Sequence, residues 1–167
     1  MRTLIGIVGY RNLSDFSIGP VLLPALRDLD WEPGIDIEDL SYGPIAVVQN
    51  LEDRPLYDRM VFLSAAQRGR VPGDVYRREW NYPLPSEEEI QARITEAVTG
   101  VIDIDNLLVV IQYFRVLAPY VVVFEVEPFE YESGEALSPV IDAMKPSILE
   151  SVRTEAHGRR NFSPTIH

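Results

Sequence analysis

Cysteine is absent from this chain of 167 residues, and histidine occurs only twice. The lack of cysteine excludes disulfides, thiolate zinc sites, iron–sulfur clusters and a cysteine nucleophile. His157 and His167 both lie near the C-terminal end, so the body of the chain offers no imidazole. A histidine-based metal site or a Ser-His pair would therefore need a histidine from the C-terminal tail.

Basic residues are scarce relative to acidic ones. Lys and Arg number 15 and Asp and Glu number 26, which gives a net charge of 15 − 26 = −11. A charge of this sign repels phosphate backbones and anionic lipid surfaces. We therefore expect neither nucleic acid nor a membrane surface among the partners.

Long apolar runs are also missing. The longest ones are interrupted by Asp105, Gln112, Arg115 or Glu125, so none is suited to crossing a bilayer. The N-terminal segment 4–8 is apolar, but it lacks a small-residue cleavage site and is better interpreted as a first strand than as a signal sequence. We expect a cytoplasmic protein.

What is present is typical of one globular domain. Hydrophobic residues make up 46% of the chain and charged residues 25%, close to the average for soluble proteins. A length of this order suffices for one sizeable core. We expect a single α/β domain over 1–156 and a flexible basic tail over 157–167, which contains Arg159 and Arg160.

Strand and helix patterns alternate along the chain. Apolar or alternating runs predict strands, and the predicted strands span 4–9, 35–40, 59–65, 75–80 and 120–127. Helical spacing predicts helices over 22–29, 45–51, 87–100 and 139–152, with Ser86 as an N-cap and a kink at Pro146. The apolar segment 103–117 fits either a buried helix or a strand.

This alternation predicts a three-layer α/β sandwich, in which a mostly parallel, doubly wound sheet carries helices on both faces. Ligands bind such sheets outside the carboxyl ends of the strands. A site is therefore expected among the residues that follow the strands, at 9–16, 39–43, 64–67 and 125–128.

Several common sites are not supported by the sequence. Gly6 and Gly9 do not form a dinucleotide fingerprint, because bulky Tyr10 and Arg11 occupy the turn. The phosphate-binding loop and the nucleophile elbow are absent as motifs. Ser64 ends a strand without a flanking glycine or an evident base, which favours a small residue that closes a buried strand.

Carboxylates remain as candidates for chemistry. Glu125 and Glu127 share one strand face about 7 Å apart, near the separation of carboxylate pairs in acid/base catalysis, but a solvated strand end is the simpler interpretation. Asp39 is expected to point into the cleft because it is the last residue before a turn. Asp103 and Asp105 are most simply helix N-caps.

The segment 76–80, Tyr-Arg-Arg-Glu-Trp, has the composition of a contact patch. An amphipathic strand at the edge of the sheet explains the same pattern. Tyr76 and Trp80 are the partner-contact candidates.

The chain carries an ordered series of short motifs. They are the opening run 4–19, Ile-Asp-Ile-Glu-Asp at 35–39, Met-Val-Phe-Leu-Ser-Ala at 60–65, Pro-Gly at 72–73, Val-Glu-Pro at 126–128 and Leu-Ser-Pro at 137–139. In the order and spacing of these motifs, the chain resembles the hydrogenase maturation endopeptidases, which process the C-terminus of nickel–iron hydrogenase large subunits. The resemblance covers about residues 3 to 153.

The resemblance implies a cleft in which two carboxylates and a histidine hold the nickel of the precursor. The first carboxylate follows the aspartate of the first turn; this chain keeps Asp15 but continues with Phe16. Ser64 stands where the second carboxylate falls, and no histidine lies near Gly100. Glu125 adds charge where the family tends to have glycine. Phenylalanine and a neutral serine are poor nickel ligands.

We therefore expect no metal site and no cofactor, and a protease-like protein that is non-proteolytic and acts as an assembly factor or chaperone for a hydrogenase-type metalloenzyme subunit. One alternative is a working protease that holds a harder cation with Asp15, Asp39 and Asp103. Another is a binding module unrelated to hydrogenases that reuses the scaffold.

Overall fold

The computed structural model describes residues 1–129, 134 and 136–158. The elements are β1 (Thr3–Val8), η1 (Ser14–Ser17), α1 (Ile18–Asp28), β2 (Ile35–Asp39), α2 (Pro44–Glu52), β3 (Arg59–Ala65), β4 (Val75–Glu79), α3 (Glu87–Val98), α4 (Ile104–Tyr113), β5 (Tyr120–Val126), α5 (Pro139–Ala143) and α6 (Lys145–His157). They agree with the predicted alternation of strands and helices, and segment 103–117 contains a helix.

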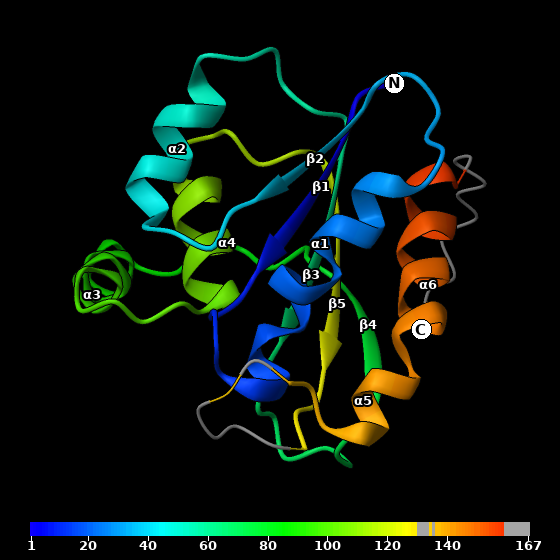
Figure 1. Ribbon diagram of the computed structural model, residues 1–167. Coiled ribbons are helices and arrows are strands. Elements are labelled where there is room, and N and C mark those ends of the chain that lie inside the picture. Colours follow the sequence, from blue (N-terminus) through cyan, green and yellow to red (C-terminus); the bar gives the residue numbers. More distant parts are fainter. Residues whose placement is uncertain (130–133, 135, 159–167) are drawn as a thin grey trace, which may run out of the picture.

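The strands form one sheet in the order β2-β1-β3-β5-β4. The pairs of β1 with β2, β1 with β3 and β3 with β5 are parallel, whereas β4 pairs antiparallel with β5 at the edge. Helices α2, α3 and α4 lie on one side of the sheet and α1, α5 and α6 on the other (Figure 1). The predicted mostly parallel, three-layer α/β sandwich is confirmed.

Alternating side chains of the sheet build two cores. Leu4, Phe62 and Val123 pack with α2 and α4. Ile5, Leu63 and Phe124 point to the other face and pack with α1, α5 and α6. Because successive strand side chains point to opposite faces, continuous apolar runs are what a sheet covered on both sides requires.

The last helical segment differs from the prediction. It is divided into α5 and α6 at Met144, and Pro146 lies in the first turn of α6, where its missing N–H removes no helical hydrogen bond. The helical spacing over 139–152 predicts an inward-pointing Val140, but this residue is 48% exposed. His157 is the last residue of α6, and the predicted tail beyond Gly158 lies outside the described residues.

Two further corrections concern helix starts. Asp103 caps α4 as predicted, since its carboxylate accepts the N–H of Asn106 at 2.9 Å. Asp105 is not a cap; it lies in the first turn of α4 and pairs with arginines. The helix predicted over 22–29 would place Pro24 in its first turn, but α1 begins at Ile18, so Pro24 lies inside the helix.

Candidate functional site

A cleft of about 360 Å³ opens at the carboxyl edge of the sheet. In the sheet, β2 lies on one side of β1 and β3 lies on the other side. The direction in which strands are added therefore reverses at β1. This reversal separates the segments that follow β1 and β3, which is where doubly wound sheets form ligand crevices. The cleft is lined by Tyr10, Leu13, Phe16, Ala65, Ala66, Gln67, Arg68, Val101, Ile102, Asp103 and Ile104.

Aromatic rings form one wall of the cleft. Phe16 meets Tyr10 edge to face, with 6.3 Å between ring centroids. The Tyr10 hydroxyl accepts the N–H of Ile102 at 2.8 Å, which connects this wall to the loop between α3 and α4. The position at which the family resemblance implies a metal-binding carboxylate is thus occupied by an apolar ring that lines the cleft.

Asp15 does not line the cleft. Its side chain is fully buried, and its carboxylate accepts hydrogen bonds from the N–H of Phe129 and from both the N–H and the hydroxyl of Ser138, each at 2.8 Å. The residue therefore joins the turn after β1 to the segment that leads into α5. Charge-assisted hydrogen bonds of this kind are stronger than those between neutral groups.

The other carboxylates predicted for the cleft lie apart from one another. Asp39 ends β2, on the far side of β1 from β3, where it accepts hydrogen bonds from the guanidinium of Arg11 at 3.0 Å and the N–H of Ser41 at 2.9 Å. Asp103 lines the cleft, but it also caps α4. Ser64 is buried beside this edge, and its hydroxyl lies 3.4 Å from the carbonyl oxygen of Ala65.

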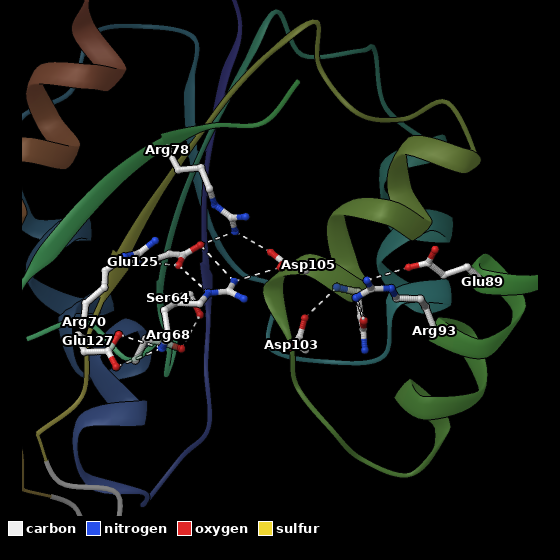
Figure 2. Close-up of polar contacts among 12 residues, drawn as sticks. Ser64, Arg68, Arg70, Arg78, Glu89, Arg93, Asp103, Asp105, Glu125 and Glu127 are labelled. Carbon is white, nitrogen blue, oxygen red and sulfur yellow. Dashed lines mark hydrogen bonds and ion pairs between the residues drawn. The ribbon is translucent and has the colours of Figure 1, made fainter. Parts of the chain in front are cut away.

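Glu125 is the centre of a buried cluster of charged groups (Figure 2). Its fully buried carboxylate pairs with Arg68 at 3.0 Å, with Arg70 at 3.2 Å and closely with Arg78. Asp105 completes the cluster by pairing with Arg68 at 3.1 Å and with Arg78 at 2.6 Å. Three guanidinium groups therefore surround two carboxylates next to the cleft.

Two arginines of this cluster, Arg68 and Arg78, have a raised pKa. Burial alone lowers the pKa of Arg68, but hydrogen bonding and the charges of Glu125 and Asp105 raise it by more, so the net direction is upward. The pKa of Arg78 is raised in the same way, against the effect of burial, mainly by Asp105.

Glu127 has a separate role close by. It is buried, and its carboxylate accepts the N–H groups of Arg68 and Gly69 at distances from 3.0 to 3.1 Å. The interpretation of Glu125 and Glu127 as a solvated strand end is therefore wrong. Both carboxylates are buried, and both hold the segment that follows β3: Glu125 through arginine side chains and Glu127 through backbone N–H groups.

Sequence reasoning missed the arginines. Arg78 was assigned to an amphipathic edge, and Arg68 lies in a segment that shows no periodic pattern. The antiparallel pairing of β4 with β5 brings Arg78 to Glu125, because Tyr76 is the register partner of Glu125 and Arg78 follows on the same face. Arg68 reaches Glu125 from the segment after β3, which pairs in parallel with β5. The available signal was a glutamate between two apolar residues near the end of β5, since a buried charge requires cationic partners.

The two edge aromatics differ in accessibility. Tyr76 is 47% exposed, and the guanidinium of Arg70 lies over its ring at 3.9 Å. Trp80 is partly buried against the core beside α4, and its indole N–H donates to Gln112 at 3.1 Å. The edge strand predicted for 75–80 is confirmed as β4.

Among the described residues, no three side chains of His, Cys, Asp or Glu are placed to hold a metal ion. In that part of the chain, the oxygen-only site suggested for Asp15, Asp39 and Asp103 is thus not formed. His157 packs edge to face against Trp31 at 5.3 Å, and His167 lies outside the described residues. No described helix is long and apolar enough to span a bilayer.

Comparisons with known proteins support this description of the fold. No family model matches the chain, and no curated protein matches its sequence. Among solved structures, it is similar to a hydrogenase 2 maturation peptidase from a Thaumarchaeota archaeon, with a TM-score of 0.65, 23% identity and coverage of 95% of this chain and 99% of that one.

Two further neighbours carry related names. The hydrogenase maturating endopeptidase HybD from E. coli has a TM-score of 0.67 at 21% identity, with coverage of 91% of this chain and 90% of that one. The [NiFe] hydrogenase maturation protease HycI from Thermococcus kodakarensis has a TM-score of 0.60 at 17% identity, with coverage of 94% and 93%. The chain thus has the fold of these proteins, and the fold that the motif resemblance implied is confirmed.

Proposed function

We propose that this chain is a non-proteolytic relative of the hydrogenase maturation proteases, which binds a hydrogenase-type metalloenzyme subunit and assists its assembly. The fold shared with maturation proteases supports a role with such a subunit. The observation that carries the non-proteolytic part is the lining of the cleft, where Phe16 presents a ring and Asp103 is the one carboxylate among the described lining residues.

The side chains that line the cleft are not suited to binding nickel. The nickel in question would be carried by the client subunit and is not a cofactor of this chain. Nickel prefers imidazole and anionic oxygen or sulfur ligands in sites of this kind. Asp103 already accepts a backbone hydrogen bond as the cap of α4. Arg68, which also lines the cleft, has a guanidinium group without a lone pair to offer a metal ion.

The buried cluster around Glu125 supports a binding role over a chemical one. A general acid or base needs a carboxyl group that can exchange a proton with a substrate. The Glu125 carboxylate is instead surrounded by three arginines and has no exposed surface. Such a cluster is suited to fixing the shape of the cleft wall that carries Arg68.

The exposed edge of β4 is the proposed contact region for the client. Tyr76 offers an accessible ring stacked on Arg70, and both aromatic and arginine side chains are enriched at interfaces. Trp80 contributes its outer surface to the same edge. A partner that contacts this edge would lie close to the cleft, because Arg70 and Arg68 bind the same carboxylate.

The test is a cleavage and binding assay with hydrogenase large-subunit precursor, loaded with nickel or free of it. Intact mass spectrometry reports truncation of the precursor, and biolayer interferometry reports binding. We expect binding without loss of mass, while an active maturation protease acting on its own precursor serves as the positive control. Nickel-dependent cleavage by this chain would overturn the proposal, and so would the absence of binding in both nickel states.

A further inference from the structure

A shallow apolar groove of about 120 Å³ lies between α2 and α3. Gly43, Pro44, Ile45 and Ala46 form one side, and Ile94, Ala97 and Val98 form the other. Val98 is 82% exposed and Ile45 is 39% exposed. Single exposed apolar residues are common, but a groove lined by apolar residues from two helices is a feature of interaction sites.

The groove exists because the apolar stripe of α3 extends beyond the core. Ile90, Ile94, Ala97 and Val98 recur at helical spacing, yet Ile90 is the only buried residue of the helix. Figure 1 shows α3 at the periphery of its layer, beside α4 and away from the sheet. The first turns of the stripe therefore pack on the domain, while its last turn remains uncovered by the described residues.

The groove and the cleft lie close together along the chain. Val98 ends α3 on one side of a short connection, and Val101, which is 38% exposed, lines the cleft on the other. The Tyr10 hydroxyl accepts a hydrogen bond from the N–H of Ile102, which fixes this connection to the domain. A partner segment that occupies the cleft could thus continue over Val101 and Val98 into the groove.

The two helices that line the groove are acidic, and Glu96 lies within the lining stretch of α3. Within their bounds, α2 and α3 carry five glutamates and one arginine, a net charge of 1 − 5 = −4. That arginine, Arg93, is engaged by Glu89 at 3.1 Å and by the side-chain carbonyl of Asn106 at 2.7 Å. The exposed carboxylates favour a partner with lysine or arginine beside its apolar group.

We propose that the groove between α2 and α3 is a docking site for a basic segment of a protein partner, which inserts one apolar side chain. The groove is somewhat smaller than the roughly 150 Å³ cavity that holds a benzene ring, so it suits a single branched aliphatic side chain. This inference extends the proposed function by assigning a docking surface to the client, and it rests on that function for the identity of the partner.

The first test needs no client. A short amphipathic peptide of leucine and lysine is titrated into the full chain, and methyl NMR signals of Ile45, Ile94 and Val98 are followed. We expect saturable shifts at these methyl groups that weaken as salt is added. A counterpart peptide with glutamate in place of lysine should leave them unchanged. Equal binding of both peptides, or shifts located elsewhere, would overturn the proposal.

The second test uses matched variants. Val98→Ser should raise the Kd for the basic peptide on the order of tenfold, as expected for the loss of one apolar contact. Val71→Ser removes an equally small apolar group that is 69% exposed in the segment between β3 and β4, and it should have no effect. If wild-type chain dimerises with increasing concentration and Val98→Ser does not, a second copy is the occupant and the proposal is wrong.

The same variants separate this inference from the proposed function. If large-subunit precursor binds the wild type and Val98→Ser equally, the docking site is wrong while the client assignment stands. If the peptide tests succeed and the precursor does not bind, the docking site stands and the client is a different basic protein.

Discussion

Asp15 and Ser138 are joined by two hydrogen bonds across 123 positions of the sequence, one from the Ser138 N–H and one from its hydroxyl, each at 2.8 Å. The aspartate that the family resemblance places in the first turn thus serves here as a tie between the turn after β1 and the start of α5. Because both residues are buried, the strength of this tie should be visible in the stability of the whole domain.

Replacing Asp15 by alanine should lower the free energy of unfolding by about 3 kcal/mol, since buried donors lose a charged acceptor. Ser138→Ala removes only the hydroxyl donor and should cost about 1 kcal/mol. Urea unfolding followed by circular dichroism measures both, and the double variant gives the coupling energy. A coupling energy near zero would show that the two residues do not stabilise one another.

Neutralising Glu125 should be far more damaging than neutralising a surface glutamate. Glu125→Gln leaves Arg68, Arg70 and Arg78 without their central anion, so we expect a loss of about 3 kcal/mol or more of unfolding free energy. The loss arises because Asp105, which pairs with Arg68 and Arg78, is then the one carboxylate left in the cluster for three partly buried guanidinium groups.

Glu89→Gln is the matched control for Glu125→Gln. It breaks the exposed i,i+4 pair with Arg93 and should change stability by no more than about 0.5 kcal/mol. Unfolding in guanidinium would screen these interactions, so urea is the denaturant of choice. Equal effects of the two substitutions would mean that the Glu125 cluster is solvated.

Stability should decline in acid partly through Glu155. Burial raises the pKa of this carboxyl, but hydrogen bonds from Arg77 and Tyr120 lower it by more, so its folded pKa lies below the ordinary 4.5. A group with a depressed folded pKa contributes stability above its unfolded pKa and loses it as the pH falls through the folded value. The difference in unfolding free energy between wild type and Glu155→Gln should therefore be constant above pH 6 and shrink below pH 4.5.

Glu150→Gln is the control for this pH dependence. Glu150 lies on the same helix, α6, and its carboxylate makes no hydrogen bond or ion pair with another described residue. Urea unfolding at a series of pH values should show the shrinking difference for Glu155→Gln alone. A pH-independent difference for Glu155→Gln would contradict the assigned shift.

Trp80→Ala should both weaken client binding and destabilise the domain. The indole packs on the core and donates to Gln112, so its removal should cost about 2 kcal/mol, less than for a fully buried tryptophan. Tyr76→Ala should cost only about 0.5–1 kcal/mol, the value of an exposed cation–π contact. Tyr76→Ala therefore tests the edge of β4 as a contact surface on an intact domain, and wild-type affinity in it would argue against that surface.

Local patterns in the sequence were sufficient for most of the fold. The apolar runs of β1, β3 and β5, the Ser86 cap of α3 and the edge position of β4 follow from side-chain periodicity and capping, which act within a few residues. The division of the last helix was not predicted. The sequence does not distinguish a proline in the first turn of a helix, as Pro146 is in α6, from a proline that kinks a longer helix.

The surroundings of each carboxylate were decided by the tertiary structure. The sequence determined that the chain has little imidazole, no thiol and a phenylalanine after Asp15, and these absences follow from residue identity alone. Whether Asp15, Glu125 and Glu127 face solvent, a ligand or other protein groups depends on partners far away in the sequence. The nearest of these partners is Arg78, which lies 125 − 78 = 47 positions before Glu125. Only the pairing of distant strands brings those partners within the few ångströms over which hydrogen bonds and buried ion pairs act.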